Sequence, residues 1–478
     1  MQKAKNRLCP VFGRCGGCTL LNLPYEEQIK KKQDIVNDLL SKYCKVDPII
    51  GMEGSPWHYR NKVHWAFAGD RKGGIVAGSY EESTHRIVSL KGCMLEDETA
   101  DRIMCTIRDL MPSFRLTGYN EYTGRGFLRH VLIRTGRKTN EVMVVLVTAT
   151  NVFPGKNNFI RVLREKHPEI TTIVMNLNDK YTSMVLGDKD TVLYGRGYIE
   201  DELCGKRFKI SPRSFYQINP VLTEILYRTA IEMAGFTGKE NVIDAYCGVG
   251  TIGLIAAEHV KQCIGVELNR DAVRDAIANA KTNGIKNISF VCADAGEYME
   301  ELAANGERAD VVLMDPPRTG SSEAFIRSLS VMKPEKIVYV SCNPETLARD
   351  LAGLTKAGYK VKRIIPVDMF PGTDDVETVI LLSRKTPDAI IEIDLEMSEL
   401  DLTRAESKAT YKEIEEYVQN KYGLHVTNLY IAQVKREFGI IERINYNVGD
   451  GKSRVPKVTP EKREAIIDAL KYFQMIEA

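Results

Sequence analysis

The chain lacks the features of a membrane or secreted protein. Hydrophobic residues make up 44% of its 478 positions and charged residues 27%, yet no uncharged apolar run is long enough to span a bilayer. The first residues, MQKAKNRLCP, are partly basic, but no apolar stretch follows them, so they do not resemble a secretory signal. We therefore expect a globular protein of the cytoplasm with no membrane association.

An excess of one charge is also lacking. The 66 basic and 64 acidic side chains give a net charge of +2, which excludes a protein with a basic surface throughout, such as a histone. Any site for nucleic acid must therefore be local. At ordinary domain sizes, 478 residues are enough for roughly three domains that each bury a core, so we expect a monomer.

Eleven cysteines without an export signal point to metal binding, catalysis or core packing rather than to disulfides. Cys9, Cys15 and Cys18 gather on one Gly-containing loop, and Cys93 is a candidate fourth ligand; for Cys93 alone, an ordinary core thiol is the alternative. Four thiolates hold either zinc or an iron–sulfur cluster. From the spacing, zinc is the commoner occupant.

Four segments differ in their sequence pattern. Residues 1–44 hold the cysteine cluster and a basic helix, and residues 45–204 show alternating runs between turns, which predicts a mostly β central domain. Residues 205–386 alternate apolar strands with helical stretches, and residues 387–478 are rich in charged helix formers. We treat these four segments as the predicted domains.

The third segment predicts a parallel, doubly wound sheet of six strands, completed by a seventh. The seventh, Val376–Ser383, follows the sixth with no room for a helix, so it should pair antiparallel at or near an edge. The first six are Val242–Cys247, Cys263–Glu267, Ile288–Cys292, Val311–Asp315, Ile337–Ser341 and Lys360–Val367.

A glycine-rich loop runs from Asp244 through Gly248 and Gly250 to Gly253, after the first of these strands and before a helix. Glycines there allow a ligand to approach the backbone N–H groups, and Glu267, which ends the next strand, is placed to bind a ribose hydroxyl. The alternative is a tight turn made for packing. The loop by itself fits a dinucleotide and S-adenosylmethionine equally well.

Two further motifs end neighbouring strands. Asp315-Pro-Pro-Arg318 ends the fourth and Ser341-Cys342-Asn-Pro ends the fifth, so the Cys342 thiol should share a rim with Asp315 and the glycine loop. An isolated cysteine is more often a small buried residue. Its position at this rim favours a nucleophile instead.

Five ordered blocks resemble the RNA (uracil-5-)-methyltransferase family, in particular its iron–sulfur 23S rRNA type. The resemblance spans about Cys9 to Arg384. It implies an α/β fold in which a seven-stranded Rossmann-like class I methyltransferase domain joins the mostly β central domain and the N-terminal Cys-cluster segment. The blocks are Ser214-Phe-Tyr-Gln217-Ile-Asn219, Asp244-Ala-Tyr246-Cys-Gly, Asp315-Pro-Pro-Arg318, Ser341-Cys342-Asn-Pro and Phe370-Pro-Gly-Thr373 to Glu377.

The resemblance also implies roles for single residues. Carbon-5 of uracil is too weak a nucleophile to take a methyl group directly, so a thiolate must first add at carbon-6. Cys342 would be that nucleophile, and Glu377 the base that removes the carbon-5 proton; without the resemblance, a solvated charge is an equal reading of Glu377. A [4Fe-4S] cluster would sit on the four cysteines, and S-adenosylmethionine would be lined by Gln217, Tyr246, Thr251, Glu267, Asp294 and Asp315.

The sequence departs from the family in two places. Asp375 stands where the family usually has His, and a carboxylate there should raise the pKa of the neighbouring base and alter proton abstraction. Many members begin with a small RNA-binding barrel, whereas eight residues precede Cys9 here, so we expect that module to be absent.

Basic and aromatic residues interleave in Trp57–Lys62 and Arg125–His130, as stacking on splayed bases requires. A solvated strand face is the alternative, and the family context favours RNA, with a uridine flipped toward Cys342.

The tail predicts three helices, Ala409–Tyr422, Asn428–Phe438 and Pro460–Phe473. The first two are spaced as in a helix-turn-helix, with basic side chains for phosphate. A helical appendage without a specific role is the alternative. The basic residues are Lys435, Arg436 and Arg443.

The function predicted from these observations is methylation of a uridine in RNA, with 23S rRNA as the first candidate and tRNA as the second. Two alternatives come from other classes. A nicotinamide-dependent oxidoreductase would use the glycine loop but leaves the motifs at Asp315 and Cys342 unexplained. A non-catalytic RNA-binding or assembly factor would follow if Asp375 had abolished activity.

Overall fold

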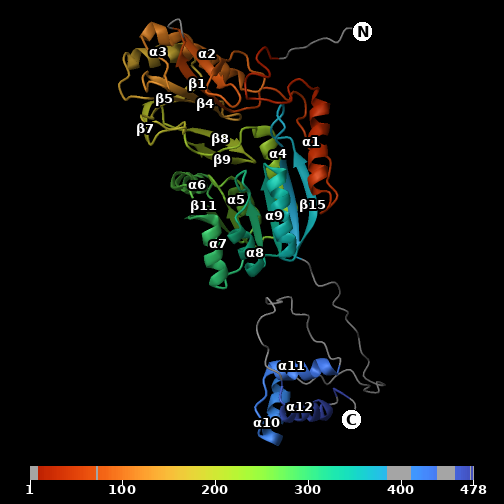
Figure 1. Ribbon diagram of the computed structural model, residues 1–478. Helices are drawn as coiled ribbons and strands as arrows, with labels where there is room; N and C mark the ends of the chain where they lie inside the picture. Colours follow the sequence, from red (N-terminus) through yellow and green to blue (C-terminus); the bar gives the residue numbers. More distant parts are fainter. Residues whose placement is uncertain (1–8, 71–73, 385–410, 439–457, 474, 477–478) are drawn as a thin grey trace, which may run out of the picture. The chain divides into compact units, whose positions relative to one another are not determined.

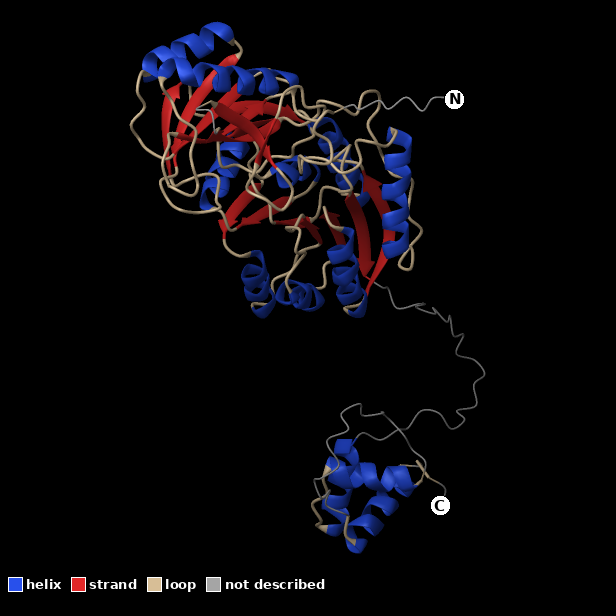
Figure 2. Ribbon diagram, turned by 45° about the horizontal axis from the view of Figure 1, so that its top comes forward, coloured by secondary structure: helices blue, strands red, loops and turns tan. Residues whose placement is uncertain are grey.

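The computed structural model describes residues 9–70, 74–384, 411–438, 458–473 and 475–476. The chain divides into two compact units, Met1–Asp388 and Ala389–Ala478. Figures 1 and 2 show the helices and strands of each unit. Within the described residues, none of the helices has both the length and the apolar character needed to cross a bilayer.

The first unit begins with a seven-stranded sheet of order β3-β2-β1-β4-β5-β6-β7. Only β5 and β6 pair in parallel, because α3 (Lys156–Lys166) connects them. Helices α2 (Glu98–Leu110) and α3 and the short 3-10 helix Met111–Phe114 share a core with one face of the sheet. The strands are β1 (Lys62–Gly69), β2 (Ile75–Tyr80), β3 (Ile87–Ser89), β4 (Leu128–Thr135), β5 (Val142–Thr148), β6 (Ile170–Leu177) and β7 (Lys189–Tyr194).

A second seven-stranded sheet has the order β12-β11-β10-β13-β14-β16-β15. Its first five strands are parallel, and β16 pairs antiparallel with both β14 and β15. The predicted class I methyltransferase fold is confirmed, and the seventh strand lies next to the edge strand, as expected. The strands are β10 (Asn241–Ala245), β11 (Gln262–Glu267), β12 (Ile288–Cys292), β13 (Val311–Met314), β14 (Lys336–Ser341), β15 (Tyr359–Val367) and β16 (Glu377–Arg384).

Apolar residues that alternate along the strands cover both faces of this sheet. In β13, Val311 and Leu313 belong to one core, and Val312 and Met314 belong to the other. Helices α4 (Pro220–Ala234), α5 (Thr251–Ala256) and α6 (Arg270–Thr282) share the first core. Helices α1 (Tyr25–Leu40), α7 (Ala295–Ala304), α8 (Glu323–Met332) and α9 (Pro344–Lys356) share the second.

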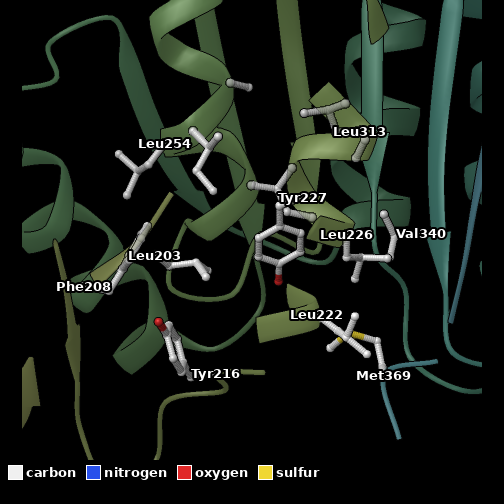
Figure 3. Close-up of a cluster of buried hydrophobic side chains, with 14 of the residues drawn as sticks. Leu203, Phe208, Tyr216, Leu222, Leu226, Tyr227, Leu254, Leu313, Val340 and Met369 are labelled. Atoms are coloured by element: carbon white, nitrogen blue, oxygen red, sulfur yellow. The ribbon is translucent and has the colours of Figure 1, made fainter. Parts of the chain in front are cut away.

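The two sheets are joined by a continuous core. The hairpin β8 (Ile199–Leu203) and β9 (Lys206–Ile210) lies between them in Figure 1. Buried residues of the first sheet, such as Met143, belong to the same cluster as residues of α4 and the second sheet. Figure 3 shows Leu203 and Phe208 of the hairpin with Tyr227 of α4 and Leu313 of β13. This packing fixes the first sheet relative to the rim of the second.

Helix α1 brings the N-terminal segment to the β15 edge of the second sheet. Its buried residues, Gln28, Lys32, Val36 and Leu40, recur every fourth position and so lie on one face. The segment after the helix forms parallel bridges from Val46 to Ile364 and from Ile50 to Val367 of β15. Figure 1 shows α1 beside β15.

The second unit contains α10 (Tyr411–Tyr422), α11 (Asn428–Glu437) and α12 (Pro460–Tyr472) around their own apolar core. The predicted role of Lys435 in phosphate binding is wrong, since its side chain is only 1% exposed in this core. Arg443 and the side chain of Arg436 lie outside the described residues.

Candidate active site

The loop after β10 is shaped by backbone conformations that favour glycine. Gly250 has φ +81°, and a Cβ atom on it would lie 2.9 Å from the Phe290 ring. The Asp244 carboxylate accepts the N–H of Gly253 at 2.8 Å, which ties the end of β10 to the first turn of α5. Tyr246 also has a positive φ of 64°, which turns the chain away from the strand. The loop therefore presents its backbone at the carboxyl end of the sheet.

One pocket brings together four of the six residues predicted to bind the cofactor. Gln217, Tyr246, Thr251 and Asp315 all line it, although Gln217 comes from the segment before α4. Phe215, 63% exposed, lines the same pocket.

The other two predicted residues flank the same loop. Glu267 accepts the N–H of Gly248 at 3.0 Å and that of Asn269 at 2.7 Å, and a carboxylate has further lone pairs for a ligand. Asp294 caps α7 by accepting the N–H of Gly296 at 2.8 Å. Burial raises the pKa of Tyr246, and the charge of Asp294 adds to this effect.

The antiparallel pairing of β14 and β16 brings the two predicted catalytic residues together. Ser341 lies opposite Thr378 in the register, so the next residue, Cys342, comes beside Glu377. Burial raises the pKa of the Cys342 thiol to about 12, and the charges of Glu377 and Asp315 add to this effect. Arg318 opposes it.

Two acids lie at this rim, Glu377, which is buried, and Asp315, which is partly exposed. Glu377 is 2% exposed, and its Oε2 atom has no hydrogen-bond partner among the residues that the structure describes. Burial raises the pKa of both Glu377 and Asp315, and the charges of Asp315 and Asp375 raise that of Glu377 further. The effect expected from Asp375 is therefore confirmed in direction.

Arg318 and Tyr227 belong to this site but were not among the predicted site residues. The Arg318 guanidinium forms an ion pair with Asp375 at 2.8 Å, and its charge opposes the rise in the pKa of Cys342. The Tyr227 hydroxyl is 3.5 Å from Thr251 Oγ1. Burial raises the pKa of this phenol, and the charges of Asp315 and Glu377 add to the effect. Arg318 was detectable as the last residue of its motif, whereas nothing in the α4 sequence marks Tyr227.

The two mixed basic and aromatic runs are partly structural. Tyr59 donates its hydroxyl hydrogen to the Pro371 carbonyl at 3.0 Å, and Arg129 donates to the carbonyls of Asn178 and Lys180 at 2.8 and 2.7 Å. The prediction that these runs stack on bases is wrong for the members that are buried, because buried rings cannot receive a base. These members are Tyr59, Phe127, Arg129 and His130.

The four predicted ligand cysteines, Cys9, Cys15, Cys18 and Cys93, line one cavity of about 180 Å³. Burial raises the pKa of the Cys18 thiol to about 11, and the neighbouring Cys15 and Cys9 add to this effect. All eleven cysteines are free. Among the described residues, no group of three or more His, Cys, Asp or Glu side chains is arranged to hold a single metal ion.

Comparison with known proteins identifies the family. Residues 185–385 match the family model described as tRNA (Uracil-5-)-methyltransferase. A Halalkalibacterium halodurans protein named as an uncharacterized RNA methyltransferase is 45% identical over 382 residues, which cover 79% of this chain and 83% of that protein. The chain belongs to the RNA uracil-5-methyltransferase family. A protein of Bacillus cereus with the same description is 42% identical over 385 residues, covering 80% of this chain and 83% of its own.

A solved structure is similar to this family member over most of its length. It is the Pyrococcus abyssi tRNA (uracil-54, C5)-methyltransferase in complex with S-adenosyl-L-homocysteine, with a TM-score of 0.66 and 29% identity. The similarity covers 77% of this chain and 86% of the other. The protein is therefore an S-adenosylmethionine-binding methyltransferase of a family that methylates RNA.

We expect Glu267→Ala to weaken S-adenosylmethionine binding by roughly tenfold or more, because hydrogen bonds to a charged group are the strong ones. Calorimetric titration measures the change. Affinity for RNA should stay within about twofold, because phosphate contacts dominate it. Glu301→Ala, at an exposed position of α7, is the matched control and should change neither. Equal loss of both affinities would show that the cofactor site lies elsewhere.

Proposed function

We propose that this protein methylates carbon-5 of a uridine in RNA, with Cys342 as the nucleophile and Glu377 as the base. The observation that carries the proposal is the pairing of β14 with β16, which brings Cys342 beside Glu377. The charge of Asp315, which lines the cofactor pocket, acts on Cys342 as well. A nucleophile, a buried base and a methyl-donor pocket at one rim are what this reaction requires.

The bonds change in a fixed order. The Cys342 sulfur adds to carbon-6 of the uracil, which makes carbon-5 nucleophilic. Carbon-5 takes the methyl group from the sulfonium of S-adenosylmethionine, which leaves as S-adenosylhomocysteine. Glu377 removes the carbon-5 proton, and the bond from sulfur to carbon-6 breaks to restore the double bond.

The charges at the site fit these steps. Arg318 holds a positive charge at Cys342, which favours the thiolate against the opposing charges of Glu377 and Asp315. Asp315 lines the pocket and would face the positive charge of the methyl donor. In this proposal Gln217, Tyr246, Thr251, Glu267 and Asp294 complete the donor's site.

For the substrate we propose 23S rRNA first, on the resemblance of the motifs, and tRNA second. The second candidate is favoured by the solved neighbour, which acts on uridine 54 of tRNA. Mass mapping of both RNAs from a strain without this protein distinguishes them, because only the true substrate loses a methyl group from a uridine.

We also propose that Cys9, Cys15, Cys18 and Cys93 hold a [4Fe-4S] cluster. Their shared cavity supports this assignment, because four thiolates are the ligand set of such a cluster. The cluster would supply a rigid cross-link between the N-terminal segment and the loop that carries Cys93.

The mechanism predicts that Glu377→Gln traps a covalent adduct between protein and RNA. Cys342 can still add and the methyl group can still transfer, but removal of the proton stalls. A denaturing gel shows the adduct as a shifted band that accumulates only with S-adenosylmethionine. The band must be absent in Cys342→Ala. Methylation of carbon-5 by Cys342→Ala would refute the mechanism.

The raised pKa of Glu377 predicts a rate that climbs with pH, because the base acts only when ionised. Asp375→Asn removes a charge that raises this pKa, so the acid limb of the profile should move to lower pH. Single-turnover rates between about pH 6 and 9 measure the shift. Asp375→Glu keeps the charge and should keep the wild-type limb. An unchanged limb in Asp375→Asn would mean that another group controls the profile.

The cluster assignment predicts that protein purified without oxygen is brown and contains iron and sulfide. Cys93→Ser should lose the visible absorbance, because the cluster needs all four thiolates. Cys292→Ser, which removes an exposed thiol that does not line the cavity, should keep it. Colourless wild-type protein with stoichiometric zinc would reject the cluster.

A further inference from the structure

The connection between β15 and β16, residues 368–376, is held by the N-terminal segment of the chain. The Gly372 carbonyl accepts the N–H groups of Thr19 at 3.0 Å and Leu20 at 2.9 Å. The Gly372 N–H donates to Gln28 Oε1 at 2.8 Å. The Asp374 N–H donates to Thr19 Oγ1 at 3.0 Å, and the Thr19 hydroxyl donates to Asp374 Oδ1 at 3.1 Å.

A buried ion pair fixes the start of the same loop. Lys32 of α1 pairs with Asp368, and both side chains are 0% exposed. Lys32 also donates to the Phe370 carbonyl at 2.9 Å, and the Tyr25 hydroxyl donates to Asp368 at 2.8 Å. A buried ion pair is weak evidence for stability, because desolvation offsets its attraction. Its geometric effect is clear, since it ties this loop to α1.

The loop carries the groups on which the proposed chemistry depends. Asp375 lies on it and pairs with Arg318, whose charge acts on Cys342. Glu377 follows directly as the first residue of β16. A displacement of the loop would therefore move the partner of Arg318 and the proposed base together.

The other end of the N-terminal segment belongs to the cysteine cavity. Thr19 directly follows Cys18, and Leu21 is buried in one cluster with Cys9, Cys18 and Cys93. Arg60, which lines the cavity, donates to the Gly17 carbonyl at 3.0 Å. The hydrogen bonds to Gly372 thus begin at the residue directly after a predicted metal ligand.

We propose that Thr19, Gln28 and Lys32 are positioning residues for Glu377. We also propose that the cysteine centre, formed by Cys9, Cys15, Cys18 and Cys93, controls the position of Glu377 through Thr19. This inference rests on the proposed function for the role of Glu377. In this role the centre needs no electron transfer. When the four cysteines are held together, Thr19 and Leu20 keep their hydrogen bonds to the loop. When the cysteines are released, these hydrogen bonds break and the loop becomes mobile.

Thr19 offers a matched pair of variants, because its side chain is exposed. Thr19→Val removes the hydroxyl that bonds Asp374, whereas Thr19→Ser keeps it. Hydrogen–deuterium exchange of a peptide spanning residues 368–377 should be about fivefold faster in Thr19→Val, as expected for a lost hydrogen bond, and unchanged in Thr19→Ser.

The same pair separates positioning from binding. In Thr19→Val, kcat should fall by roughly five- to tenfold while KM for S-adenosylmethionine stays constant, because no residue of the loop lines the cofactor pocket. The covalent adduct should also accumulate, since a misplaced base slows elimination. Equal exchange in the two variants, or faster exchange in Thr19→Val without a fall in kcat, overturns the proposal.

The link to the cysteines is tested without any measurement of activity. Cys18→Ser in the full chain should speed exchange of residues 368–377 as Thr19→Val does, and Cys292→Ser should not. Unchanged exchange in Cys18→Ser overturns the link. This exchange measurement needs no RNA, so its result does not depend on the proposed function. A wild type that fails to methylate, together with a Glu377→Gln variant that forms no adduct, would instead refute the proposed function.

Discussion

The antiparallel insertion of β16 between β14 and β15 is the constraint on which the rest of the site depends. A strand parallel to β14 at this place would begin at the amino-terminal ends of the parallel strands, far from the rim where β14 ends. Because β16 runs the other way, its first residue, Glu377, starts where Cys342 follows β14. The hairpin-like connection from β15 to β16 then lies at the same rim, together with Asp315.

Burial gives these groups their chemistry. Burial of Glu377 and partial burial of Asp315 raise the pKa values of both acids, and their charges in turn oppose ionisation of Cys342. Arg318 is the compensating charge, and it is shared between Cys342 and Asp375. Asp375 therefore acts on the site in two ways, by raising the pKa of Glu377 and by holding Arg318. This is how a second carboxylate beside the proposed base is accommodated in the structure.

The N-terminal segment extends this arrangement beyond the methyltransferase sheet. Residues between Thr19 and Lys32 bond the loop before β16, and the chain just before them lines the cysteine cavity. The shared core of the two sheets has a similar effect on the other side, because Gln217 and Phe215 reach the pocket from the chain between the β8–β9 hairpin and α4. Elements far apart in the sequence thus converge on one rim.

The sequence by itself determined the class I fold. Its apolar strands alternate with helical stretches, which predicts a parallel sheet covered by helices on both faces. The strand ends were predicted to within two residues, as for β10 and β13. Motifs at strand ends were predictable for the same reason, since the carboxyl ends of parallel strands meet at one edge. Tertiary structure alone decided which side chains reach that edge from elsewhere, as with Tyr227, and whether a basic residue is exposed. Lys435 and Arg129 are buried for reasons that no local pattern carries, because burial depends on elements distant in the chain. The bonds from Thr19 to Gly372 and Asp374 join positions more than 350 residues apart, which only the folded chain brings together.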